Sequence, residues 1–314
     1  MMKSKSLWHL CSQKSILREE VIQTASNLLL GKAVYSNIST GTERLVAMGN
    51  IPKELQETMK VPYQKGDFNF PVQYGYSMII KIEERYYHLM HPHQDYCLIS
   101  VDSLTPIPTD MDLKVASQIA NMETVINAIW DSKLTESSDV LVCGFGSIGS
   151  LLAVTLAKEY NLDVYIKESN SHKLDVAEKL GFKTRNFPKE FAICYNTTAN
   201  EKALQFCIDN SCEEGTILEL SWYGNRSIQL NLGGKFHTKR LHLKSVQVSK
   251  IPIQKRDTET YKSRRYKAIE ILEKHSSTYK KLITNEIPFI KSPDFFNALR
   301  KEQFQEAIIN IINY

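Results

Sequence analysis

The sequence predicts an α/β protein that combines a doubly wound parallel sheet with a second, β-rich part. Strand-like apolar runs alternate with helical patterns between about residues 113 and 250. Before about residue 112, short runs rich in Val, Ile and Tyr are separated by prolines, which is typical of strands joined by loops. The length of 314 residues fits two domains of about 150 residues each.

Composition and charge exclude several classes of protein. Hydrophobic residues make up 42% of the chain and charged residues 24%, which excludes a disordered chain. The net charge of +4 is too small to indicate nucleic-acid binding. The six cysteines form no CxxC pair and residues 1–10 contain no apolar signal sequence. We therefore expect a cytoplasmic protein without a disulfide framework.

One uncharged run could be mistaken for a membrane span. Val140 to Ala157 has eighteen residues without a charge, which is the length of a short transmembrane helix. Three glycines divide this run into a strand, a turn and a helix, so no membrane association is predicted.

The first part of the chain is predicted to form strands with an irregular insertion. The stretch Gly49–Gly75 is long and irregular, which is typical of loops with a function, and we expect it to shape a substrate pocket. The predicted strands are Val34–Tyr35, Ser77–Ile82, Tyr86–Met90 and Tyr96–Val101.

The second part begins with a helix and then alternates strands with helices. Asp110 or Asp112 is expected to cap a helix that runs to about Asp131, because apolar residues recur there at helical spacing. The residues from Lys255 to Tyr314 are predicted to be mostly helical. The alternating elements are strands at Val140–Cys143, Val164–Ile166, Phe191–Tyr195 and Ile217–Leu220, and helices at Ile148–Tyr160, His172–Leu180 and Glu201–Asp209.

A G-x-G-x-x-G motif lies between a predicted strand and a predicted helix. Gly144 would allow the tight turn, Gly146 would let a pyrophosphate approach the backbone, and Gly149 would let the helix pack against the strand. The first amides of the helix, including those of Ser147 and Ile148, would receive the phosphate charge. This context predicts a dinucleotide-binding turn.

An acidic residue at the end of the next strand indicates which coenzyme binds. Glu168 follows Gly149 by nineteen residues, the spacing at which a carboxylate bonds the ribose hydroxyls of NAD and repels a 2′-phosphate. We therefore predict NAD rather than NADP, although Lys167, Ser169 and Asn170 could accept a phosphate. The alternative is that the glycines only form a tight turn and that Glu168 is a surface acid.

Several blocks of the sequence resemble the medium-chain dehydrogenase/reductase superfamily, which includes the zinc alcohol dehydrogenases. Further blocks are similar to a zinc-lacking branch that contains bacteriochlorophyllide dehydrogenase. The first set is Ser39–Glu43, Gly75–Ser77, and Val142–Gly149 with Glu168 and Lys179–Gly181. The second set is Gln64–Val72, His91–Gln94, Asn121–Thr124, Ser221–Gly224 and Gly233–His237.

The resemblance implies an arrangement of domains. Residues 1–112 would form the first part of a GroES-like catalytic domain, residues 113–250 a Rossmann domain, and the helical residues 251–314 would return to the catalytic domain. The active site would lie in the cleft between the two domains. A homodimer is expected because relatives often dimerise.

The resemblance also implies that no zinc is bound. The positions of the zinc ligands in that superfamily match Ser39, Tyr76 and Ala120 or Asn121, none of which is a good zinc ligand at neutral pH. The pair His91 and His93 could ligate a metal, but no third ligand is evident, and a loop stabilised by the histidines is favoured.

Without zinc, hydrogen-bond donors must stabilise the charge that develops on a substrate oxygen. The candidates are Tyr76, Ser39, Thr40 and a protonated His93, and Glu123 is a candidate base. The alternatives are a packed tyrosine for Tyr76 and a solvated or salt-bridged acid for Glu123.

Two further pairs of residues are predicted to contact the coenzyme. Asn121 and Thr124 share one helix face, which by resemblance lies toward the nicotinamide. Trp222 and Tyr223 follow a strand at the carboxyl edge of the predicted sheet, where ligands of such sheets bind. The alternative for the two aromatic residues is a covered hydrophobic edge.

These observations predict a zinc-independent, NAD-linked oxidoreductase that moves a hydride between nicotinamide and a secondary alcohol or ketone. An enoyl or quinone reductase and a non-catalytic nucleotide-binding protein are the alternatives. Residues 220–256 contain eight Lys and Arg and no Asp or Glu, so an anionic substrate is one expectation, with Lys239 and Arg240 at the rim of the site. A solvated basic face is the other interpretation.

Overall fold

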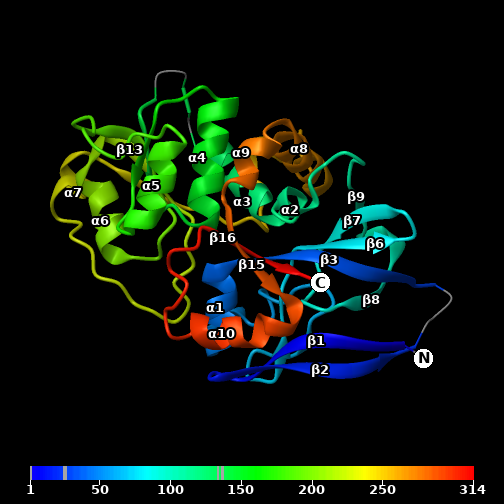
Figure 1. The fold of residues 1–314 in the computed structure, drawn as a ribbon. Helices are drawn as coiled ribbons and strands as arrows, with labels where there is room; N and C mark the ends of the chain where they lie inside the picture. Colours follow the sequence, from blue (N-terminus) through cyan, green and yellow to red (C-terminus); the bar gives the residue numbers. More distant parts are fainter. Residues whose placement is uncertain (1, 24–26, 133, 136–137) are drawn as a thin grey trace. The chain divides into compact units, whose positions relative to one another are not determined.

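The computed structural model describes residues 2–23, 27–132, 134–135 and 138–314, and the chain folds into two compact units (Figure 1). The first unit contains residues 1–120, 283–305 and 309–314, and the second contains residues 121–282 and 306–308. The chain therefore leaves the first unit, forms the second, and returns. Among the described residues, no helix is both long and apolar enough to cross a membrane.

The first unit contains two sheets. The smaller has the strand order β2-β1-β5-β4, and the larger has the order β15-β16-β3-β6-β7-β9, with β8 paired to β3. The strands are β1 (Met2–Cys11), β2 (Lys14–Ile22), β3 (Leu29–Ile38), β4 (Lys65–Gly66), β5 (Val72–Gln73), β6 (Met78–Ile82), β7 (Arg85–Leu89), β8 (Tyr96–Ile99), β9 (Thr105–Pro106), β15 (Ile283–Pro288) and β16 (Ile309–Asn313).

Short helices accompany these sheets. Leu7 of β1, Ile38 of β3 and Phe296 share one hydrophobic cluster, so a helix from the end of the chain is packed against strands from its beginning. The helices are α1 (Thr40–Met48), α2 (Leu113–Ala116) and α10 (Ser292–Leu299), and the 3₁₀ turns are η1 (Lys53–Leu55), η2 (Val101–Ser103) and η4 (Phe289–Lys291).

The second unit is built on one parallel sheet of the order β11-β10-β12-β13-β14. Its strands are β10 (Val140–Cys143), β11 (Val164–Lys167), β12 (Phe191–Asn196), β13 (Ser211–Glu219) and β14 (His242–Ser245). Its helices are α3 (Ile119–Asp131, which starts in the first unit), α4 (Ser147–Glu159), α5 (Ser171–Lys179), α6 (Glu201–Asp209), α7 (Lys235–Thr238), α8 (Tyr261–Lys274) and α9 (Ser276–Lys280), with the 3₁₀ turn η3 (Ile253–Lys255).

Apolar side chains of the strands and of α6 form a core of this unit. Leu141 of β10 and Cys194 of β12 pack with Leu204 and Cys207 of α6, so α6 covers one face of the sheet. All residues of β10 and all but Ala192 of β12 are buried, as expected for parallel strands covered on both faces. The predicted doubly wound α/β sheet is confirmed.

The strand order also contains a switch point. After β10 the chain forms β11 on one side of it and then crosses to form β12 on the other side. Ligands of open α/β sheets bind outside the carboxyl ends of the strands at such a reversal. A ligand would therefore be expected at the turn after β10 and at the residues after β12.

Two predictions about helix and strand boundaries need correction. The helix after Asp112 is interrupted, because Ser117 Oγ donates a hydrogen bond to Lys114 O and α3 begins only at Ile119. β13 starts at Ser211 rather than at Ile217. The first half of β13 contains the exposed Glu213 and Glu214, so it has no apolar run that would predict a strand.

The prediction of a mostly helical segment from Lys255 to Tyr314 is wrong in its second half. β15 and β16 form a parallel pair there, and β16 also pairs antiparallel with β3 of the first unit. Exposed side chains alternate with less exposed ones along β15, so its sequence has too few apolar residues to predict a strand. The return to the first unit begins at Ile283, and the likeness of that unit to a GroES-like domain stays a prediction.

The N-terminal hairpin of β1 and β2 was not predicted. Ser4, Ser6 and His9 are buried at its inner positions, so the strand shows polar residues where a search expects apolar ones. Each of these polar groups has a partner: for example, the Ser4 hydroxyl donates to Asp95 Oδ1 at 2.8 Å.

Candidate functional site

The glycine turn after β10 has the geometry that its motif predicts. Gly144 has a φ of +95°, a left-handed conformation that favours glycine. A Cβ atom on Gly149 would lie 2.1 Å from Gly144 O, whereas a Cβ on Gly146 would meet no atom within 4 Å. Gly149 therefore serves helix packing, and Gly146 leaves open space beside the first amides of α4.

The amides of α4 that follow the turn are the expected anion site. Ser147 and Ile148 open this thirteen-residue helix, where the N–H groups and the helix dipole favour a negative charge. The Ser147 hydroxyl is used elsewhere, since it donates to Ile308 O at 3.0 Å. The contribution of Ser147 to an anion site is therefore its backbone amide.

Glu168 lies next to the glycine turn, as predicted. One carboxylate oxygen accepts the Phe145 amide at 2.8 Å, and the other accepts the amides of Ser169 and Asn170 at 2.7 and 2.9 Å. These bonds hold a carboxylate at the end of β11, directly beside the turn. The two parts of the motif, far apart in sequence, are thus joined by a hydrogen bond.

A row of paired residues crosses the carboxyl edge of the sheet. The strand register pairs Lys167 with Cys143, Cys143 with Asn196, Asn196 with Glu219, and Glu219 with Ser245. This row places Glu168 and Glu219 on opposite sides of the glycine turn. A dinucleotide bound with its pyrophosphate on α4 would extend in both directions along this edge.

Three residues at this edge were missed by the sequence analysis. The Thr197 hydroxyl donates to Cys143 O at 2.9 Å, and a Cβ on Gly144 would lie 2.8 Å from Thr198 Cγ2, so both threonines touch the glycine turn. Glu219 ends β13. The signal for all three is their position at the end of an apolar strand or directly after it, the same position that singled out Glu168, Trp222 and Tyr223.

Tyr223 is part of a polar cluster with these residues. Its hydroxyl donates to Glu219 Oε2 at 3.1 Å, and the Asn196 amide donates to the same oxygen at 2.7 Å. The Ser221 amide donates to Glu219 Oε1 at 2.8 Å. Burial raises the pKa of Glu219, while these hydrogen bonds oppose the rise. Trp222 is partly buried beside the cluster.

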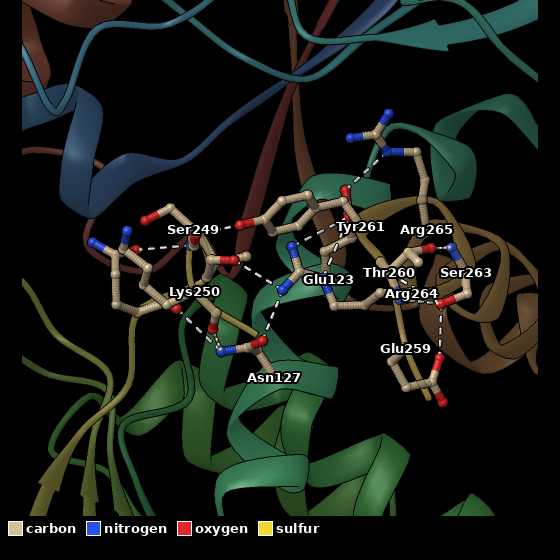
Figure 2. Close-up of polar contacts among 12 residues, drawn as sticks. Glu123, Asn127, Ser249, Lys250, Glu259, Thr260, Tyr261, Ser263, Arg264 and Arg265 are labelled. Atoms are coloured by element: carbon tan, nitrogen blue, oxygen red, sulfur yellow. Dashed lines mark hydrogen bonds and ion pairs between the residues drawn. The ribbon is translucent and has the colours of Figure 1, made fainter. Parts of the chain in front are cut away.

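The helix α3 supplies a second polar network, shown in Figure 2. Glu123 Oε1 lies 3.4 Å from Arg264 Nε, and Glu123 Oε2 lies 3.1 Å from Arg265 Nε. Glu123 and Arg264 are only 4% and 3% exposed. Of the two interpretations of Glu123, the structure shows the salt-bridged acid. Asn121 is buried and Thr124 partly buried on the same helix.

Arg264 and Asn127 hold the loop that follows β14. Arg264 Nη1 donates to Val248 O at 2.8 Å and to Asn127 Oδ1 at 2.7 Å. Asn127 Nδ2 donates in turn to Gln247 O and Lys250 O, both at 3.1 Å (Figure 2). Burial lowers the pKa of Arg264, and the Glu123 charge opposes that effect. The buried pair thus fixes backbone at the carboxyl end of the sheet.

In the first unit, His93 lies in a buried chain of hydrogen bonds. Its Nε2 is 2.8 Å from Glu43 Oε2, and its Nδ1 is 2.8 Å from Ser36 Oγ. Ser36 Oγ is 2.9 Å from the hydroxyl of Tyr314, and Glu43 Oε1 accepts the Ser39 amide at 2.7 Å. His93 and Glu43 are at most 1% exposed, so this histidine can exchange protons only through its partners.

Tyr76 is close to this chain. Burial and the Glu43 charge raise the pKa of Tyr76 to about 12, although hydrogen bonds with the Ser39 and Thr42 side chains act in the opposite direction. Tyr76 is therefore a neutral phenol at physiological pH, which can donate a hydrogen bond. Thr40, at the start of α1, accepts a hydrogen bond from Asn310 Nδ2 at 3.2 Å. The first unit thus brings together Tyr76, Ser39 and His93.

His91 serves the loop rather than the chain around His93. Its Nδ1 donates to Pro92 O at 2.7 Å, its ring packs 5.0 Å from that of Tyr63, and burial lowers its pKa to about 4. Among the described residues, no group of three or more His, Cys, Asp or Glu side chains is arranged to hold a metal ion.

The placement of Lys239 and Arg240 at the rim of the site is wrong. Lys239 Nζ bonds Glu190 Oε1 at 2.6 Å and Ser211 O at 2.8 Å, and Arg240 pairs with Glu214. These partners lie near the amino ends of β12 and β13. Because β14 runs parallel to its neighbours, the chain must cross back to the amino edge before β14 begins, and this carries both cations away from the glycine turn.

Comparisons with known proteins show the fold. No family model matches the chain, and no curated protein matches its sequence. The chain is similar in structure to a short chain alcohol dehydrogenase of Escherichia coli CFT073 complexed with NADH, with a TM-score of 0.74, 14% identity, and 99% of each chain covered.

Two further solved structures agree. 2R,3R-butanediol dehydrogenase of Bacillus subtilis matches with a TM-score of 0.74 at 13% identity over 100% of both chains. TarJ of S. aureus in complex with NADPH matches with a TM-score of 0.71 at 15% identity over 99% of both chains. At these identities the likeness establishes the fold, and the chain has the fold of these dehydrogenases along its whole length.

Proposed function

We propose that the protein is a NAD-linked oxidoreductase that interconverts a secondary alcohol and a ketone without zinc. The observation that carries this proposal is the glycine turn, where Gly146 leaves open space and Glu168 bonds the Phe145 amide. The shared fold with dehydrogenases whose structures hold NADH or NADPH supports it.

The residues of the second unit fit a dinucleotide. The amides at the start of α4 would bind the pyrophosphate, and Glu168 would accept the ribose hydroxyls. The carboxylate would repel the 2′-phosphate of NADP, so we propose NAD as the preferred coenzyme. When bound, the coenzyme supplies or accepts the hydride, and the protein binds and orients it.

The first unit would supply the donors that stabilise a negatively charged substrate oxygen. Tyr76 is a neutral donor at physiological pH, and burial raises its pKa further, to about 12. Ser39 and Thr42 hydrogen-bond its hydroxyl, and the negative charge of Glu43, which is bonded to His93, acts on it from nearby. Such a preorganised donor stabilises charge as it develops during the reaction.

The chemistry of these side chains does not suit zinc. Zinc prefers thiolate, imidazole and carboxylate ligands. Ser39 and Tyr76 offer only hydroxyl groups, and both ring nitrogens of His93 are bonded to Glu43 and Ser36. Asn121 is a buried helix residue with an amide side chain. We therefore propose that hydrogen bonds replace the metal.

Coenzyme binding tests the first half of the proposal. NADH and NADPH are titrated separately, with nicotinamide fluorescence as the readout. We expect NADH to bind at least about tenfold more tightly, since a carboxylate beside a phosphate costs on the order of 1–2 kcal/mol. In Glu168→Gln the preference should narrow or reverse. Equal or tighter binding of NADPH by the wild type would contradict the assignment.

A substrate panel with a tyrosine variant tests the second half. Alcohols, ketones, enones and quinones are assayed with the preferred coenzyme. Tyr76→Phe should lower kcat about 10²- to 10³-fold with unchanged coenzyme affinity, because it removes one preorganised donor. Tyr87→Phe, the same change on β7, serves as the control. Turnover of enones or quinones alone would favour a reductase of conjugated bonds, and tight NADH binding without any turnover would favour a non-catalytic protein.

A further inference from the structure

We propose that Glu219, held by Asn196 and Tyr223, faces the nicotinamide half of the coenzyme and makes the protein bind the oxidised coenzyme more tightly than the reduced one. This inference rests on the proposed function, because it assigns a role within the same coenzyme site. It concerns a residue that the glycine motif does not include.

The direction of the bound coenzyme follows from the order of the strands. Glu168 directly follows β11 and would mark the adenosine side of the site, and the start of α4 after β10 would mark the pyrophosphate. The remaining, nicotinamide half must therefore extend the other way, over the carboxyl ends of β12 and β13. Glu219 is in the edge row there, two strands from Cys143, which is about 10 Å at ordinary strand spacing.

The contacts of Glu219 keep a carboxylate at this position. Its two oxygens accept hydrogen bonds from the Ser221 amide, the Asn196 side chain and the Tyr223 hydroxyl, at 2.8, 2.7 and 3.1 Å. All three are donors, and donors stabilise the ionised form of a carboxyl group. A cation beside the cluster, Arg226, lies with its Cζ 5.7 Å from the centre of the Tyr223 ring and donates to Ala199 O.

A fixed negative charge distinguishes the two forms of the coenzyme. The nicotinamide ring carries a positive charge when oxidised and none when reduced. A carboxylate near the ring therefore stabilises only the oxidised form, and a partly buried site screens this attraction less than water does. A neutral residue in the same place would not distinguish NAD⁺ from NADH by charge.

The test compares the dissociation constants of NAD⁺ and NADH by calorimetric titration of the full chain at pH 8. In Glu219→Gln, we expect the Kd of NAD⁺ to rise about tenfold and the Kd of NADH to change by less than about twofold. Glu213→Gln, an exposed glutamate on the same strand, is the matched control and should change neither. Equal changes in both constants, or no change, would overturn the proposal.

If circular dichroism shows that Glu219→Gln does not fold, a second variant tests the same proposal. Tyr223→Phe removes one donor, while the Ser221 amide and the Asn196 side chain still favour the ionised form of Glu219 at pH 8. The carboxylate then has one hydrogen bond fewer to neutralise its charge, so the ratio of the NADH to the NAD⁺ dissociation constant should rise. An unchanged or lower ratio would count against the charge argument. If the wild type binds neither coenzyme, the proposed function fails as well, whereas binding of both without a selective effect refutes only the role of Glu219.

Discussion

Alanine substitutions at two glycines of the same turn should impair different properties of the protein: stability in one case and coenzyme binding in the other. In Gly149→Ala, the new methyl group would lie 2.1 Å from Gly144 O and 2.7 Å from Thr197 Oγ1. In Gly146→Ala, the methyl group would meet no atom within 4 Å. The first change therefore perturbs the packing of α4, and the second only fills the space kept for a ligand.

The expected magnitudes follow from these distances. The closest contact of the Gly149 methyl is a backbone oxygen that no rotamer change can move, so overpacking should cost about 3 kcal/mol. The gain in helix propensity from Gly to Ala offsets about 1 kcal/mol of this. A net loss of about 2 kcal/mol lowers the melting temperature by about 4–8 °C for a unit of this size. Gly146→Ala should cost only about 0.5 kcal/mol at its N-cap position.

The assays are a thermal melt followed by circular dichroism and a fluorescence titration with NADH. Gly146→Ala should melt within about 2 °C of the wild type but bind NADH at least about tenfold more weakly, because its methyl group blocks the approach of the pyrophosphate. Gly149→Ala should show the loss of melting temperature. Equal melting temperatures for both variants, or normal NADH binding by Gly146→Ala, would refute this division of roles.

Three further predictions concern the buried charges and the metal. Arg264→Met should lower the free energy of unfolding in urea by about 3–5 kcal/mol, because Glu123 keeps a buried charge with one partner fewer, while the exposed control Lys267→Met should cost less than about 0.5 kcal/mol. Burial lowers the pKa of His91 to about 4 in the folded state, whereas the unfolded chain binds a proton there below about pH 6.5. Neutral His91 therefore contributes about 3 kcal/mol to the free energy of unfolding above pH 6.5, and this contribution is lost as the pH falls from 6.5 toward 4. His91→Gln should therefore flatten the decline of stability over that range, and an unchanged slope would contradict the burial argument. Elemental analysis should find far less than one zinc per chain, and activity should survive chelation; stoichiometric zinc lost together with activity would show that the ligand positions were assigned wrongly.

Local patterns in the sequence were enough to predict the parallel sheet and its glycine turn. The apolar strands around Val140–Cys143 and Phe191–Tyr195 are buried except for Ala192, so their composition alone identifies them. Gly144 and Glu168 were singled out because the dinucleotide-binding motif has a glycine at the tight turn and an acid at a fixed spacing after it. Helix α6 matches its predicted bounds because Asn200 caps it and apolar residues follow at helical spacing.

Elements whose inner side chains are polar could not be predicted in this way. The hairpin of β1 and β2 buries serines and a histidine, and β15 has three consecutive polar residues between its two isoleucines. The partners that make these elements stable lie outside each segment: Ser4 of β1 donates to Asp95, and β15 pairs with β16, which in turn pairs with β3. A pattern search within one segment has no access to those partners.

The doubly wound sheet, the glycine turn after β10 and the acid beside that turn could be predicted, because each follows from residues that are close together in the chain. The partners of the charged residues are set by the tertiary structure. It paired Glu123 with Arg264, which is 141 positions away, and it joined His93 to Glu43 and Ser36. It also carried Lys239 to the amino edge of the sheet. Coulombic and hydrogen-bond partners depend on distance in space, and the fold alone sets that distance.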